Sequence, residues 1–343
     1  MNFKYCASTF LVLIISGIGY SQGYISPAGV MISHAHAKGG LMFTYSYMDM
    51  NMKENWSGSE PVSDQQIWND YLYAPQSMHM GMHMLMGMYG WSDRFSLMLM
   101  KEYKSSSMTM SLPAGSIPHH QHGDSTQVAN ASVHEHYATG FGDTKLWAVY
   151  NLAQTENSSV VLSAGMSIPT GRINIEADEH AIIPGERQPY MMQPGSGTLD
   201  FLPGITYLSI AGDFTWSIQA LSTVRLFNNT AGYHYGSDLT LNAWAAHPFT
   251  SFLSASIRLE GYTASAISGY DPQINTVTQP GADPDCYGGE RFSTYGGLNL
   301  YISGGWFQNS KIALEFGTPL YQRVNGIQQV TLLQWNASIT KAL

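Results

Sequence analysis

The sequence predicts an all-β fold, a transmembrane antiparallel up-and-down β-barrel of about twelve strands. Three observations lead to this prediction. Apolar residues alternate with small or polar residues over segments of about ten residues, as in strands that cross a bilayer. Charged residues are only 11% of the chain, roughly half the usual share. The connections between the segments alternate between short and long, as turns and outer loops do in outer-membrane barrels.

The alternating segments are bounded by turn residues, which marks them as separate strands. They are Gly39–Met50, Ser77–Trp91, Arg94–Lys104, Phe141–Leu152, Ser159–Pro169, Thr198–Ser209, Phe214–Phe227, Ser237–Pro248, Ser251–Ala266, Arg291–Ser303, Lys311–Pro319 and Gln328–Lys341. Every second connection is short, for example Ser92-Asp93, whereas the others are mostly long, for example Ser105–Gly140. An even number of strands predicts that both chain ends lie on the periplasmic side.

The first residues are typical of a secretory signal peptide. Lys4 supplies a positive charge, Phe10–Ile18 form a short apolar core, and small residues precede a cut between Ser21 and Gln22. We therefore expect a signal peptide over residues 1–21, a periplasmic N-terminal segment over 22–38 and a barrel over 39–343. The expected location is the cell outer membrane, with outer-membrane lipid around the barrel.

Composition and motifs exclude several classes of function. The formal net charge is −9, and an acidic chain argues against a nucleic-acid partner. Cys286 is the only cysteine beyond the signal peptide, so no intrachain disulfide is expected. The chain lacks a G-x-S-x-G elbow, an H-E-x-x-H motif and a glycine-rich phosphate loop before a helix. We therefore predict that the protein is not an enzyme.

Methionine is concentrated in the first third of the chain. Fifteen of the eighteen methionines after the initiator lie between Met31 and Met110, and every even position from Met78 to Met88 is methionine. Thioethers favour Cu(I), and imidazoles extend this preference to Cu(II) and zinc. Two interpretations remain open: the methionines handle a soft metal, copper above silver or zinc, or they are unbranched apolar side chains that fill space.

The phase of each strand predicts which side chains face the lumen. In Gly39–Met50 and Arg94–Lys104, aromatic residues and leucine share one face, which should meet lipid. The opposite, luminal face then carries Met42, Met48, Met50, Met98 and Met100. In Ser77–Trp91 the methionines alternate with His79 and His83, and an imidazole in lipid is costly. We therefore expect His79 and His83 in the lumen, with the alternative that this strand is turned over.

A second group of histidines lies in the long connection Ser105–Gly140. They are His119, His120, His122, His134 and His136. Short histidine-rich tracts suggest metal binding, so these residues are candidates for capturing ions at the outer mouth. The alternative is that they are solvated loop residues.

Several strings, in order along the chain, resemble a family of bacterial outer-membrane barrels labelled as transporters and as meta-pathway phenol-degradation proteins. The strings are Pro27-Ala28-Gly29-Val30-Met31, Gly140-Phe141-Gly142-Asp143, Ile168-Pro169-Thr170-Gly171, Gly195-Ser196-Gly197-Thr198-Leu199-Asp200, Arg258-Leu259-Glu260-Gly261, Gly288-Gly289 with Arg291, and Leu314-Glu315-Phe316-Gly317. The resemblance implies an outer-membrane barrel with a channel or transport role, and it supplies no catalytic residues.

The resulting functional prediction is an outer-membrane channel or transporter-like barrel that binds or passes copper through methionine and histidine. The only cofactor that the sequence suggests is a metal, copper above silver or zinc. One alternative is a channel for small hydrophobic or aromatic compounds, which requires a continuous apolar lumen. Another is a structural barrel that conducts nothing.

Overall fold

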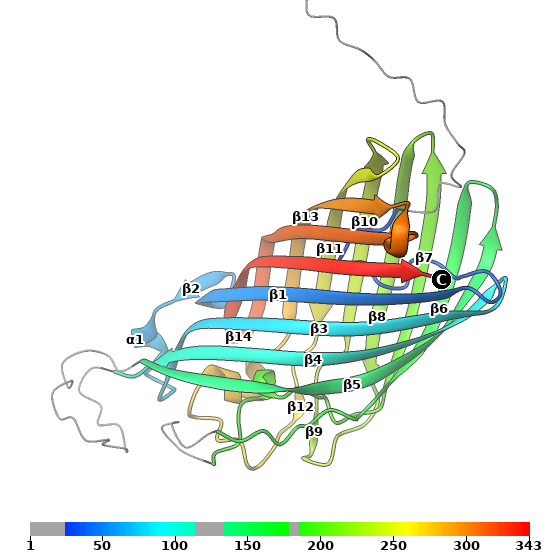
Figure 1. Ribbon diagram of the computed structural model, residues 1–343. Helices are drawn as coiled ribbons and strands as arrows, with labels where there is room; N and C mark the ends of the chain where they lie inside the picture. The colour runs from blue at the N-terminus through cyan, green and yellow to red at the C-terminus, as the bar shows by residue number, and fades with distance from the viewer. Residues whose placement is uncertain (1–24, 114–132, 178–184) are drawn as a thin grey trace, which may run out of the picture.

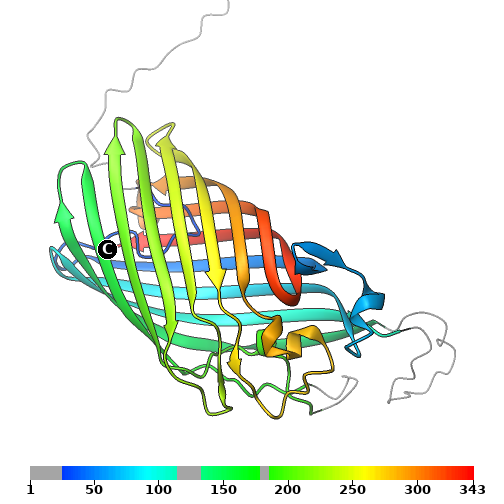
Figure 2. The same cartoon turned by 180° about the vertical axis from the view of Figure 1, so that it is seen from behind.

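The computed structural model describes residues 25–113, 133–177 and 185–343, which form an all-β barrel (Figures 1 and 2). The predicted signal peptide, together with His119, His120 and His122, lies outside the described residues. No helix in the described ranges is long and apolar enough to cross a membrane.

Eleven strands make up the wall. They are β1 (Leu41–Gly58), β3 (Ala74–Ser92), β4 (Phe95–Ser111), β5 (Val133–Gln154), β6 (Ser158–Ile168), β7 (Asp200–Ala211), β8 (Phe214–Arg225), β10 (Asp238–Pro248), β11 (Leu253–Ala264), β13 (Gly289–Ile302) and β14 (Ser310–Ala342). The connections carry short elements: β2 (Glu60–Val62), α1 (Asp64–Ile67), η1 (Tyr190–Met192), β9 (Tyr233–His234), β12 (Ser268–Gly269), η2 (Pro280–Ala282), η3 (Pro284–Cys286) and η4 (Gly305–Phe307).

The wall closes because the last strand pairs with the first. Neighbours follow the order β14-β13-β11-β10-β8-β7-β6-β5-β4-β3-β1, with an additional β14–β1 pairing and with β2 attached to β1 outside the ring. β14 has two arms, because residues 310–324 pair antiparallel with β13 and residues 327–342 pair antiparallel with β1. The chain reverses near Gly326, whose φ is 55°. Because β14 contributes both of its arms, the wall made by the eleven strands has twelve strand segments. The predicted barrel is confirmed.

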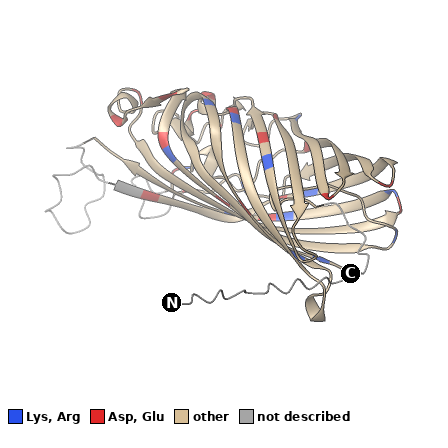
Figure 3. Ribbon diagram, turned by 90° about the horizontal axis from the view of Figure 1, so that it is seen from above, with Lys and Arg blue, Asp and Glu red and all other residues tan. Residues whose placement is uncertain are grey.

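The alternation in the sequence separates an outer from an inner face. Leu85, which lies on the outer face of β3, is 63% exposed, whereas Met88, which lies on the inner face, is 3% exposed. Large apolar side chains are exposed in the same way on nearly every wall strand, and most residues of the strands are uncharged (Figure 3). An exposed apolar surface of this extent fits contact with lipid.

The wall is taller on one side. The strands β1, β3, β4 and β5 have 17 to 22 residues, whereas β6, β7, β8, β10, β11 and β13 have 11 to 14. The shorter bounds predicted for β1, β4 and β5 are wrong, because pairing continues through polar stretches such as residues 105–107. Beyond this stretch the inner face is apolar again, since Met78, Met108 and Met110 pack with Tyr73 and Met192.

The long connections meet at one end of the barrel, which we call the loop end; the short ones mark the turn end. At the loop end, the Leu72 amide donates to the Val277 carbonyl (3.1 Å), which joins the connection after β1 to the connection after β11. Tyr190 and Tyr233 are both fully buried there, with ring centroids 4.6 Å apart. The described parts of the long connections therefore form a packed layer.

Three of the strings behind the family resemblance meet at one buried carboxylate. Asp143 accepts hydrogen bonds from the Gly171 amide (2.9 Å), the Ser196 amide (2.8 Å) and the Ser196 hydroxyl (2.6 Å). A Cβ on Gly195 would lie 2.7 Å or less from backbone atoms of Gly171, so this approach of two chains requires glycine. The strings thus tether the connection between β6 and β7 to the barrel wall.

Residues 25–38, which we call the luminal segment, lie inside the turn end of the barrel. The Trp244 indole donates to the Ile25 carbonyl (3.2 Å) from β10, and the Gln219 amide donates to the Met31 carbonyl (2.8 Å) from β8. The segment then reaches the turn between β3 and β4, where the Lys38 amide donates to Asp93 (3.1 Å). The sequence predicts a separate segment before the barrel, whereas the structure places these residues within its mouth.

Candidate functional site

The barrel encloses a cavity of about 1300 Å³. The luminal segment bounds the cavity toward the turn end, and its walls come from two groups of strands. One group, β1, β3 and β4, contributes a methionine face; the other, β8, β10, β11, β13 and β14, contributes a polar face. The ring order places β3 and β4 across the lumen from β10 and β11, so a solute in the cavity would have an apolar wall on one side and a polar wall on the other.

The methionine face is formed by alternate residues of three neighbouring strands. Its members are Met42, Met48 and Met50 of β1, Met82, Met84, Met86 and Met88 of β3, and Met98 and Met100 of β4. The five methionines predicted in the lumen, from β1 and β4, do line it. Their role as metal ligands stays a prediction.

The two histidines of β3 lie on the outer face, so their predicted luminal placement is wrong. His83 Nδ1 is 2.8 Å from the Tyr45 hydroxyl, and His79 Nε2 is 2.6 Å from Asp49 Oδ2. The carboxylate of Asp49 also accepts from the Tyr47 hydroxyl (3.0 Å). These partners satisfy the imidazoles and reduce the cost of placing them outside the lumen.

Register with β1 is the physical reason for this orientation. Residues directly opposite each other on neighbouring strands point to the same face. Ser46 lines the cavity and pairs with Met84, and Met42 pairs with Met88. The inward face of β1 therefore turns the methionines of β3 inward and its histidines outward.

The polar face is built around a buried arginine. The side chain of Arg258 is 1% exposed and makes two parallel hydrogen bonds, both 2.9 Å, to the two carboxylate oxygens of Glu315. It also donates to Asn242 (2.8 Å) and to Glu260 (2.6 Å), and it stacks on the Tyr295 ring at 3.8 Å. A forked guanidinium facing a carboxylate is the strongest common form of ion pair, which offsets the cost of burying both charges.

A second arginine extends this cluster toward the cavity. Arg291 contacts Glu260 at 3.3 Å, and the Tyr295 hydroxyl donates to the same carboxylate at 3.2 Å. Arg291 and Glu260 both line the cavity. On the opposite side, Lys145 and Glu102 form a further luminal ion pair at 3.1 Å. These luminal charges are therefore paired within the wall.

The luminal segment rests on the polar face at one glycine. The Gly29 amide donates to Glu315 (3.0 Å), and a Cβ at this position would collide with the paired side chains of Glu315 and Arg258. Nearby, Ile32 is buried with a φ of 55°, which is unusual for a β-branched residue. Its carbonyl is held by the Thr206 hydroxyl at 3.3 Å. The segment thus keeps a strained backbone that its contacts must stabilise.

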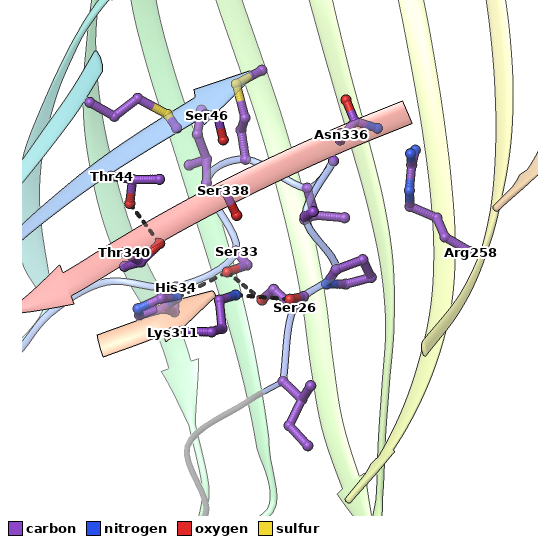
Figure 4. Close-up of a pocket in the computed structure, with 18 of the residues that line it drawn as sticks. Ser26, Ser33, His34, Thr44, Ser46, Arg258, Lys311, Asn336, Ser338 and Thr340 are labelled. Carbon is purple, nitrogen blue, oxygen red and sulfur yellow. Dashed lines mark hydrogen bonds between the residues drawn. The ribbon is translucent and has the colours of Figure 1, made fainter. Parts of the chain in front are cut away.

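The luminal segment carries two histidines, His34 and His36, where it contacts the barrel wall. Figure 4 shows His34 beside Ser33, with Lys311 and Ser26 next to them. The Ser33 hydroxyl is 2.9 Å from His34 Nδ1, and Lys311 Nζ donates to the Ser26 carbonyl at 2.9 Å. Burial, followed by the nearby His36 and Lys311, lowers the pKa of His34 to about 4. Burial also lowers the pKa of His36.

The histidines predicted at the mouth contribute no defined metal site within the described ranges. His136 lies near the loop end of β5, where its Nδ1 is 3.2 Å from the Gln188 side chain. His134 belongs to the same strand. In residues 25–113, 133–177 and 185–343, no group of three or more His, Cys, Asp or Glu side chains is placed to hold a metal ion.

The sequence analysis missed the polar face as a cluster. It named Arg258, Glu260, Glu315 and Arg291 only as parts of the strings behind the family resemblance. A usable signal was present, because charged residues inside strands that cross a membrane are rare and point inward.

Comparisons with known proteins agree with this architecture. A family described as "Putative MetA-pathway of phenol degradation" matches residues 111–278. The family resemblance inferred from the sequence strings is confirmed by this match together with the fold. No curated protein sequence matches the chain.

Among solved structures, an outer-membrane channel from Pseudomonas putida F1 is similar over 93% of this chain and 100% of its own, with a TM-score of 0.57 and 13% identity. The toluene transporter TodX of P. putida covers 90% of each chain, with 12% identity and a TM-score of 0.43. The first likeness shows the fold, and the second is too distant to add to it. The chain is therefore an outer-membrane type of β-barrel.

Proposed function

We propose that this barrel is an outer-membrane channel for small apolar solutes, with aromatic compounds as the main class. The single observation that carries the proposal is the methionine face of a cavity of about 1300 Å³. Thioether side chains are flexible and polarizable, and they make favourable sulfur–aromatic contacts. A face of nine such side chains can adapt to rings of different shape without binding any one of them tightly.

The arrangement supports an aromatic solute better than copper. The histidines proposed beside the luminal methionines, His79 and His83, lie on the other side of the wall. Glu102 and Lys145, and Glu260 and the two arginines, which line the cavity, are engaged in ion pairs with one another. Of the other luminal histidines, His34 shares a hydrogen bond with the Ser33 hydroxyl. The nine methionines thus offer a continuous apolar surface, which suits an aromatic solute.

The proposal includes an orientation in the membrane. The turn end, which contains the luminal segment and the C-terminus, would face the periplasm, and the loop end would face outward, as in other barrels of this kind. Residues 1–21 would be removed as a signal peptide, and residues 39–343 would form the membrane domain. Lipid would cover the outer face.

Uptake of labelled toluene by cells that depend on this barrel tests the proposal. The variant Met84→Gln/Met86→Gln places two amides on the methionine face. An amide without partners in apolar surroundings costs roughly 1–3 kcal/mol, so uptake should fall by about tenfold or more. Met166→Gln is the matched control, since Met166 is exposed on the outer face. Equal uptake with the wild-type barrel and with cells lacking it would reject the channel.

A further inference from the structure

The two luminal arginines differ in how much of their hydrogen-bonding capacity is used. Arg258 makes four hydrogen bonds of 2.6 to 2.9 Å. Arg291 makes two long ones, to Thr331 (3.4 Å) and to Glu260 (3.3 Å). Its buried Nε has no hydrogen-bond partner among the residues that the structure describes. A guanidinium has five N–H donors. Because Arg291 lines the cavity and each of its two terminal nitrogens makes only one hydrogen bond, these nitrogens can donate to a further partner in the cavity.

Arg291 also lies next to the methionine face. The hydroxyl oxygen of Thr331 is 3.4 Å from the guanidinium of Arg291 and 3.6 Å from the sulfur of Met50. Three residues further along β14, the Gln334 amide is 3.3 Å from the sulfur of Met48. A single six-membered ring can therefore lie on these thioethers while a substituent on the ring reaches Arg291.

The charge balance of the cluster indicates which substituent fits. Arg258 and Arg291 are balanced by Glu260 and Glu315. A carboxylate bound to Arg291 would lie near the carboxylate of Glu260, which like charges disfavour. A neutral hydroxyl can instead accept from Arg291 and donate to Glu260, because a hydroxyl does both.

We propose that Arg291 and Glu260 form a binding site for the hydroxyl group of a neutral hydroxylated aromatic solute, whose ring lies on Met48 and Met50. This site rests on the proposed function and narrows it from apolar solutes in general to rings with one neutral polar group. A bare hydrocarbon would leave both polar side chains facing its ring, and this is the kind of mismatch that gives strong selection.

Fluorine NMR titration of the detergent-purified barrel tests the site with three ligands of similar size. They are 4-fluorophenol, 4-fluorotoluene and 4-fluorobenzoate, used near pH 7, where the phenol is neutral and the benzoate is charged. Detergent alone serves as the blank for partition into micelles. We expect 4-fluorophenol to bind about tenfold tighter than 4-fluorotoluene, the value of one charge-assisted hydrogen bond, and tighter than 4-fluorobenzoate.

The variant Arg291→Met should remove the preference for 4-fluorophenol and leave the affinity for 4-fluorotoluene unchanged. Arg323→Met is the matched control, because Arg323 is an exposed residue of β14 outside the cavity lining. If Arg291→Met does not fold, Arg291→Lys keeps the charge beside Glu260 but loses the fork, and the preference should fall several-fold, as expected when a forked contact is lost.

The outcomes separate the two proposals. If 4-fluorotoluene and 4-fluorophenol bind equally to the wild-type barrel, or if the preference persists in the folded Arg291 variant, the hydroxyl site is rejected and the apolar channel stands. Tightest binding of 4-fluorobenzoate would replace the hydroxyl site by an anion site. If none of the three ligands binds above the detergent blank, both the site and the aromatic channel are rejected.

Discussion

Arg258 and Glu315 are almost completely buried inside the barrel, with each side chain 1% exposed. Arg258→Met would leave Glu315 and Glu260 without their main partner. Removing one member of a buried ion pair typically costs about 3–5 kcal/mol. We expect a loss of that size in the free energy of unfolding, measured by urea titration of the reconstituted barrel. Arg323→Met, which changes an exposed arginine of β14, should unfold as the wild type does; an equal loss in both variants would contradict the assignment.

His79 and His83 provide a residue-scale test of the copper hypothesis. Both imidazoles are hydrogen-bonded on the outer face, away from the luminal methionines. We expect that any Cu(I) uptake by the purified barrel, followed by anaerobic calorimetry, is the same for the wild type and for His79→Ala/His83→Ala. Binding in the micromolar range that is lost in this double variant would restore a copper site.

The luminal segment contains a buried histidine, which makes its contact with the barrel wall dependent on pH. The pKa of His34, lowered from 6.5 to about 4, means that the seated segment favours the neutral imidazole. Between pH 6.5 and 4, a segment released from the lumen binds more protons than one held in it. The bound position of the segment is therefore fully stable above pH 6.5 and becomes less stable as the pH falls toward 4. We expect the conductance of single barrels in a planar bilayer to rise over this interval. His34→Gln should show a smaller pH dependence, and an unchanged dependence would assign the effect to other groups.

Asp143 fixes a different element, the connection between β6 and β7. Asp143→Ala removes the acceptor for two backbone amides and one hydroxyl, each of which then loses roughly 1–3 kcal/mol of satisfied hydrogen bonding. The strands are paired independently of this carboxylate, so the barrel should still form. We expect limited proteolysis to cut within residues 169–199 of the variant first. Asp213→Ala, which changes an exposed turn, is the control. It should be cleaved at the same rate as the wild type.

Barrel closure is a property of the whole molecule that one cross-link can test. Thr44 of β1 and Thr340 of β14 are directly paired, and their hydroxyls are 3.0 Å apart (Figure 4). Directly paired antiparallel residues have Cα separations of about 4.5–5.5 Å, which suit a disulfide. Thr44→Cys/Thr340→Cys should form this disulfide on oxidation of the folded protein and shift the unfolded chain on a non-reducing gel. Thr44→Cys alone, which retains the native Cys286, should not shift.

At this scale the sequence analysis succeeded for physical reasons. Strands that cross a membrane must alternate, because one face meets lipid and the other meets the lumen. This rule located every wall strand from the pattern alone. It gave the wrong bounds for β1, β4 and β5, because their backbone pairing continues into polar stretches in which the alternation is lost.

The sequence by itself determined the barrel, the alternating connections and the luminal position of the methionines of β1 and β4. The tertiary structure decided the rest. The orientation of β3 follows from its register with β1. The sequence of β3 alone cannot fix this orientation, because a strand with methionine on one face and histidine on the other could turn either face to the lumen. The polar face joins Arg258 to Glu315 across 57 positions of the chain, and the luminal segment reaches Gln219 across 188. Such contacts depend on which strands become neighbours in the closed ring, and only closure brings them together.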